Sequence, residues 1–267
     1  PGTRMIAFTG SRAVGVQISE KAGRVVPGQI WIKRAILEMG GKDFILVDET
    51  ADIDDAANGV VAAAFGFQGQ KCSACSRLIV HSRVHGELLE KVVARTKALS
   101  VGDVRDPRNT IGAVINAGAQ KKILEYVAIG RKEGTIVAGG KAGPKQGYFV
   151  MPTIVDGVKP SARLACEEIF GPVLAVLKVR SFEEGIAVAN ASEYGLTGSL
   201  YSRERDRLIR GKRELYVGNL YLNRKCTGAL VGVHPFGGFN MSGTDSKAGG
   251  REYLYLFTQQ KAISERV

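Results

Sequence analysis

The chain has 267 residues, 45% of them hydrophobic and 24% charged, a composition that excludes a disordered, collagen-like or disulfide-stapled protein. Its net charge is +11, but the basic residues are scattered and paired with acids, as in Arg203 to Arg207, so we expect no nucleic-acid partner. The longest apolar stretch, Gly59 to Phe67, is too short to span a bilayer, and we expect no membrane partner either.

The start of the chain carries no charged and apolar leader, so we expect a cytoplasmic protein whose four cysteines are reduced thiols. The first residue is Pro1, in what reads as the middle of a fold, and the first predicted strand has no upstream partner. Both features predict a fragment of a longer chain.

Apolar strand-like runs alternate with helix-like runs, which is typical of an α/β protein. Taken in order, the pattern predicts strands at 5–9, 44–47, 78–80, 135–137, 152–155, 173–177 and 218–222. It predicts helices at 13–22, 53–65, 84–100, 119–130 and 182–191. Asp52 is the expected N-cap of the second helix.

The first strand runs into Gly10 and Ser11 and then into a helix that contains Gly15. Free backbone N–H groups at a helix start hold phosphates, although an ordinary strand–helix turn would look the same. Further on, Glu38 stands beside Gly40 and Gly41, where backbone can approach a ligand closely. A carboxylate there can act as a general base; the alternative is a solvated glutamate at a helix end.

Cys72 follows a glycine-rich loop and has Lys71 beside it, which predicts a lowered pKa and a nucleophilic thiol. Three alternatives stay open: a dithiol pair with Cys75, half a zinc site, or two buried thiols. Because Cys166 and Cys226 are isolated and the histidines are scattered, we expect no metal.

Glu168 and Phe170 stand before a Gly-Pro turn, where an acid and an aromatic ring can hold a ribose; alone, the segment is a loop. Taken together, these four segments resemble the aldehyde dehydrogenase superfamily over the whole chain. The segments 223–229 and 235–239 strengthen the resemblance.

The resemblance implies an α/β, aldehyde-dehydrogenase-like fold with a partial Rossmann-type coenzyme domain. Residues 1–40 would end the NAD-binding domain, 41–240 would form the α/β catalytic domain, and 241–267 would return to the coenzyme domain as an oligomerisation tail. A homo-oligomer of the full-length chain is implied.

Carried over to this sequence, the resemblance makes Cys72 the nucleophile, which passes through a thiohemiacetal and a thioester, and Glu38 the base that activates water. Cofactor contacts fall on Gly10, Ser11, Gly15, Glu168 and Phe170. The cofactor is NAD, with NADP not excluded.

Within the superfamily, the residues of these segments resemble the branch that oxidises L-glutamate γ-semialdehyde to glutamate in proline catabolism. The implied substrate contacts are Lys71, Ser73, Gly228, Ala229 and Phe236, with hydroxyl and N–H donors for the substrate carboxylate. Alternatives are a dehydrogenase of another carboxylated semialdehyde, the C-terminal module of a bifunctional proline-oxidising protein, or a non-catalytic remnant. By the same resemblance, an oxyanion asparagine lies upstream, so we expect these residues alone to be inactive.

Overall fold

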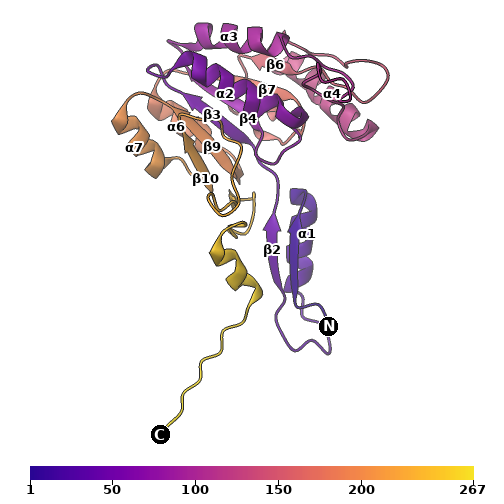
Figure 1. The fold of residues 1–267 in the computed structure, drawn as a ribbon, viewed down its shortest axis with the longest axis vertical. Helices are drawn as coiled ribbons and strands as arrows, with labels where there is room; N and C mark the ends of the chain where they lie inside the picture. The colour runs from indigo at the N-terminus through magenta and orange to yellow at the C-terminus, as the bar shows by residue number, and fades with distance from the viewer.

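The computed structural model describes residues 1–267 and shows a large α/β body with a smaller βαβ unit beside it (Figure 1). The body is built on a seven-stranded sheet in the order β10-β9-β3-β4-β7-β6-β5, parallel except for β5 against β6. The strands are β3 (Asp43–Val47), β4 (Cys75–His81), β5 (Thr135–Ala138), β6 (Thr153–Asp156), β7 (Val173–Val179), β9 (Thr197–Tyr201) and β10 (Asn219–Leu222).

Helices cover both faces of this sheet, because its strands bury apolar side chains on each side. In β3, Ile45 and Val47 join one core cluster and Phe44 and Leu46 join the other. The first cluster is covered by α2 (Ile53–Phe65) and α3 (His85–Lys97), and the second by α4 (Ala117–Glu133), α5 (Arg163–Cys166), α6 (Phe182–Asn190) and α7 (Arg205–Glu214). No helix combines the length and the apolar character that a membrane span requires.

The smaller unit consists of β1 (Met5–Thr9), α1 (Arg12–Gly23) and β2 (Arg34–Glu38), with the two strands parallel and Thr9 opposite Glu38. A later segment returns to this unit: Met39 N–H donates to the carbonyl of Ser242 at 2.8 Å, and Leu37 exchanges hydrogen bonds with Thr244. The remaining elements are η1 (Gly66–Gly69), β8 (Tyr194–Gly195), β11 (Phe239–Asn240) and η2 (Arg251–Phe257). Beyond η2 the chain extends away from the body (Figure 1).

The predicted strands and helices are confirmed to within a few residues, and Asp52 caps α2 by accepting from Asp55 N–H at 3.1 Å. Among the longer elements, β2, β9 and α7 escape the pattern, and so do the short elements α5, β8, β11, η1 and η2. In β9 the run Thr197–Tyr201 holds a glycine and a serine, and α7 is so charged that its apolar stripe is thin. Because Glu38 ends a strand and is buried, the interpretation of it as a solvated helix-end residue is wrong.

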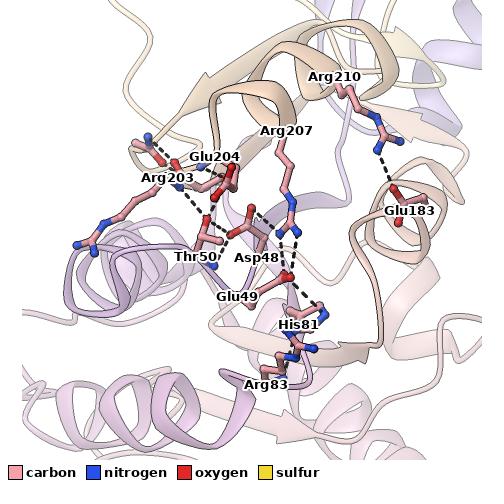
Figure 2. A network of polar contacts seen from close by, with 12 residues as sticks. Asp48, Glu49, Thr50, His81, Arg83, Glu183, Arg203, Glu204, Arg207 and Arg210 are labelled. Atoms are coloured by element: carbon pink, nitrogen blue, oxygen red, sulfur yellow. Dashed lines mark hydrogen bonds and ion pairs between the residues drawn. The ribbon is translucent and has the colours of Figure 1, made fainter.

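A network of polar contacts ties together the carboxyl ends of β3 and β4 and the start of α7 (Figure 2). Arg207 donates two hydrogen bonds to Glu49, at 2.7 and 2.9 Å, and lies 3.3 Å from Asp48. His81 lies 3.7 Å from the same Glu49 carboxylate. The network therefore closes the end of the sheet opposite to Cys72, which precedes the first residue of β4.

Candidate active site

Cys72 lies in the loop between η1 and β4, where it lines one cavity and its two sequence neighbours also line a second. One cavity has a volume of about 660 Å³ and is lined by Cys72 together with Lys71 and Ser73. The other has a volume of about 440 Å³ and is also lined by Lys71 and Ser73. A thiol in this place can react with a group that enters from one cavity while a second molecule occupies the other.

The larger cavity contains most of the residues predicted to hold a cofactor. It is lined by Gly10, Ser11, Glu168 and Phe170, at the carboxyl ends of β1 and β2, where open α/β sheets bind ligands. Gly15 does not line it; a Cβ there would come within 2.4 Å of the sulfur of Met39, so this glycine allows close packing of α1.

Glu168 is held against the turn that follows Glu38. Its carboxylate accepts from Gly41 N–H at 3.0 Å, and a Cβ on Gly40 would lie 2.3 Å from its oxygens. Burial raises the pKa of Glu168. The paired glycines therefore serve the approach of a carboxylate of this chain, which sets the oxygens of Glu168 at the cavity wall.

Glu38 is the last residue of β2 and only 9% exposed. Burial raises its pKa to about 7, Lys247 opposes that rise, and Asp245 adds to it. Its Oε1 atom has no hydrogen-bond partner in the chain and lies 3.0 Å from the position of a Cβ on Gly237. A carboxylate poised near neutrality, with a free oxygen, can take a proton from water.

The predicted lowering of the Cys72 pKa is wrong for the chain as the structure has it. Burial, followed by the charges of Asp43 and Glu38, raises the pKa of this thiol to about 11, and Glu168 adds to the rise. Lys71 does not lower the pKa of Cys72 as predicted, because its ammonium group lies near Gly66, at the end of α2.

The other thiols do not form the pair that the C-x-x-C spacing allowed. Cys75 is buried and donates weakly to the carbonyl of Arg77, and Cys226 is buried and donates to the carbonyl of Ser73. All four cysteines are free, and the structure contains no group of three or more potential metal ligands.

Charged groups are buried beneath Cys72. Lys42 is only 2% exposed and burial lowers its pKa to about 7, while burial raises the pKa of Asp43 to about 7. Asp43 accepts from Thr197 N–H at 2.6 Å, and Arg77 donates to the carbonyls of Lys42 and Val188. These groups fix the starts of β3, β4 and β9 below Cys72.

The smaller cavity brings together the residues predicted to contact the substrate. Besides Lys71 and Ser73, it is lined by Gly228, Ala229 and Phe236. Gly228 has φ +89°, a conformation that other residues rarely adopt, so the chain can turn here and leave backbone open toward the cavity.

Two lysines near these cavities escaped sequence analysis. Lys122 lines the larger cavity and donates to the carbonyl of Glu168 at 3.2 Å. Lys247 packs between loops beside Glu38. Each stands in an unremarkable run of polar residues, so no local signal could have separated them from surface lysines.

With this geometry in view, the match to known proteins is informative. Residues 1–263 match the aldehyde dehydrogenase family, and the chain belongs to that family. The predicted superfamily and fold class are thereby confirmed.

Two of the proteins it resembles share one name. The 1-pyrroline-5-carboxylate dehydrogenase of Geobacillus thermodenitrificans is 54% identical over 265 residues, covering 99% of this chain and 52% of the relative. A crystal structure of 1-pyrroline-5-carboxylate dehydrogenase from Thermus with bound NAD has a TM-score of 0.97 at 55% identity, covering 99% of this chain and 51% of that one.

A third match is the proline utilization A protein of Bdellovibrio bacteriovorus, with a TM-score of 0.93 and 45% identity over 96% of this chain and 26% of that one. The chain thus spans about half the length of the curated relatives it matches.

Proposed function

We propose that the intact protein oxidises L-glutamate γ-semialdehyde, the open form of Δ1-pyrroline-5-carboxylate, to L-glutamate with NAD or NADP. The observation that carries the proposal is the placement of Cys72 in the wall of one cavity and next to a second, which shares Lys71 and Ser73 with the first. One cavity has the strand ends and the carboxylate that suit a nucleotide, and the other has the small residues and the hydroxyl that suit a carboxylated substrate.

The Cys72 thiol loses its proton to solvent, its thiolate attacks the aldehyde carbon, and the carbonyl oxygen becomes the alkoxide of a thiohemiacetal. NAD(P)⁺, when bound, accepts the hydride of that carbon and so supplies the oxidation. The chain then carries a thioester on Cys72. Glu38 takes a proton from water, the resulting hydroxide adds to the thioester carbon, and the carbon–sulfur bond breaks to release the thiolate and a carboxylic acid, which loses its proton to solvent.

The residues around the larger cavity fit a nicotinamide cofactor. Gly10 and Ser11 offer backbone at the start of α1, and the Glu168 oxygens, held by Gly41, can accept from a ribose hydroxyl. Phe170 lines the same cavity and offers a ring face. Gly15 contributes through packing of α1 rather than through contact.

On the substrate side, Ser73, Gly228 and Ala229 supply a hydroxyl and backbone donors for the α-carboxylate, with Lys71 at the cavity wall. Phe236 packs the aliphatic middle of the substrate. The proposal extends to the division of the chain into coenzyme (1–40), catalytic (41–240) and returning (241–267) parts, and to a cytoplasmic homo-oligomer formed through the last part.

The test is a rapid-mixing assay of the intact protein with NAD⁺ and L-glutamate γ-semialdehyde. Glu38→Gln should still give a burst of reduced coenzyme close to one equivalent per site, followed by turnover at least about 100-fold slower, because an amide cannot take the proton from water. Glu20→Gln, on the exposed part of α1, is the matched control.

Loss of the burst together with turnover would assign Glu38 to an earlier step. A higher kcat/KM for succinate semialdehyde than for glutamate γ-semialdehyde would overturn the proposed substrate. The similarity to proline utilization A keeps a bifunctional parent open, and an assay for proline oxidation by the same preparation decides it.

A further inference from the structure

Lys247 has an unusual environment for a lysine. Its ammonium group donates to the carbonyl oxygens of Gly218 and Gly237, both at 2.5 Å, and more weakly to the Asn219 side chain at 3.4 Å. The group also lies over the ring of Phe239. None of these hydrogen-bond partners is a carboxylate; Glu38 and Asp245 act on the ammonium group through their charges, without hydrogen bonds to it.

The same turn packs directly on Glu38. A Cβ on Gly237 would lie 3.0 Å from Glu38 Oε1 and 2.8 Å from the carbonyl oxygen of Ser246, the residue before Lys247. Gly243, in the same returning segment, lies against Glu38 from another side and forms an isolated bridge with it. The ammonium group and the carboxylate therefore both lie against one glycine, Gly237.

We propose that Lys247 is a positioning residue for the Glu38 base, holding a positive charge behind Gly237 that keeps the buried carboxylate ionised for the hydrolysis step. The inference rests on the proposed function, because it concerns the base of that reaction. Burial removes water from a carboxylate and so destabilises its ionised form, and a nearby cation offsets part of that loss.

The electrostatic surroundings of Glu38 make this role testable. The returning segment supplies both Lys247, which lowers the pKa of Glu38, and Asp245, which raises it. The loop before β4 supplies the Cys72 thiol, whose own pKa Glu38 raises, and Glu168 acts on that thiol as well. Lys247 and Asp245 thus act in opposite directions, two residues apart.

A structural role for Lys247 is the competing explanation. The next residue, Ala248, exchanges two backbone hydrogen bonds with Phe236, at 2.8 and 2.7 Å, and Phe236 lines the substrate cavity. Removal of the lysine could therefore loosen the substrate loop. Such a defect would raise KM or lower the rate equally at every pH, whereas a charge effect moves the pH dependence.

The experiment follows the hydrolysis step directly in the intact enzyme. After a single turnover with NAD⁺ and glutamate γ-semialdehyde, acid quenching measures the decay of the acyl-enzyme between pH 5.5 and 9.5. We expect Lys247→Met to move the midpoint of the decay rate upward by about one pH unit, giving about tenfold slower decay at pH 6 and nearly normal decay at pH 9. Lys247→Arg should restore the midpoint.

Asp245→Asn is the opposing variant. Asp245 has φ 57°, a conformation that asparagine tolerates, so the backbone is preserved. Its midpoint should move downward, with faster decay at pH 6.

A pH-independent loss in Lys247→Met, a failure of Lys247→Arg to restore the midpoint, or equal midpoints in wild type and Asp245→Asn would each overturn the proposal. If Lys247→Met does not fold, Lys247→Gln makes the same test, because its amide removes the charge and can still donate to the Gly237 carbonyl; an unshifted midpoint in this variant would overturn the proposal. Absence of any acyl-enzyme in the wild type would instead reject the proposed function.

Discussion

The reactivity of Cys72 is the most direct test of the electrostatics around the site. In the ligand-free protein, burial and the carboxylates of Asp43, Glu38 and Glu168 raise its pKa from 9.0 to about 11. At pH 7.5, a thiol with the ordinary pKa is ~3% ionised, whereas Cys72 is ~0.03% ionised. Because a more basic thiolate is also more nucleophilic, the net penalty on alkylation is about tenfold.

The pH dependence is the sharper readout. Between pH 7 and 10, alkylation of Cys72 by iodoacetamide should rise about tenfold per pH unit without levelling off, since the thiolate fraction keeps growing up to its pKa. Limited labelling at each pH, followed by peptide mass spectrometry, gives the rate for Cys72. The buried Cys75 and Cys226 serve as slow references in the same digest.

Asp43→Asn is the matched perturbation. Its carboxylate lies beside Cys72, since a Cβ on Gly41 would lie 2.4 Å from Asp43 Oδ2 and 2.5 Å from the Cys72 carbonyl oxygen. Asparagine keeps an acceptor for Thr197 N–H and removes the charge, so labelling at pH 8 should be about three- to tenfold faster. Labelling that levels off between pH 7 and 8, or that is unchanged in this variant, would refute the reasoning.

Two further changes separate substrate binding from stability. Ser73→Ala should cost glutamate γ-semialdehyde about tenfold to a hundredfold in kcat/KM through one lost charged hydrogen bond and should spare a simple aliphatic aldehyde; equal losses would remove Ser73 from the carboxylate site. Arg207→Met should lower the free energy of unfolding in urea by about 1.5–3 kcal/mol at pH 7, because Glu49 loses a bidentate partner. Arg207 lowers the pKa of Glu49 from 4.5 to about 2, so this stabilisation is fully present above pH 4.5 and is lost as the pH falls toward 2. If the difference in unfolding free energy between wild type and Arg207→Met stayed constant on acidification, it would contradict this reasoning.

Much of the fold was predictable because its signals are local. The strand β3 is a run of five buried residues, and α2 begins at an aspartate that caps it and ends at a glycine. Such elements need no partner to be visible in sequence. By contrast, β9 is a strand because it lies between β3 and β10, and its own sequence, with Gly198 packed under the Phe44 ring, carries little β propensity.

For the candidate site, too, the sequence predicted what depends on local residues and missed what depends on residues brought near by the fold. The identities of Cys72 and Glu38 stand out through their glycine-rich surroundings, but their ionisation is set by residues brought near by the fold. Lys71 adjoins Cys72 in sequence, yet its ammonium group lies at Gly66, while Asp43, far away in sequence, has the largest charge effect on the thiol.

Glu38, the proposed general base, shows why the contribution of distant residues matters for mechanism. Glu38 ends a strand of the small unit, and Lys247 belongs to a segment that follows all strands of the seven-stranded sheet in sequence and then returns to that strand. Their adjacency through Gly237 exists only once both parts are in place. A carboxylate with a pKa of about 7 is half ionised at neutral pH. In the proposed reaction, a small change in this packing would therefore change the rate of thioester hydrolysis directly. The ionisation of the proposed base is therefore a property of the assembled fold, and we expect substitutions at Lys247 and Asp245 to change it without contact with the substrate.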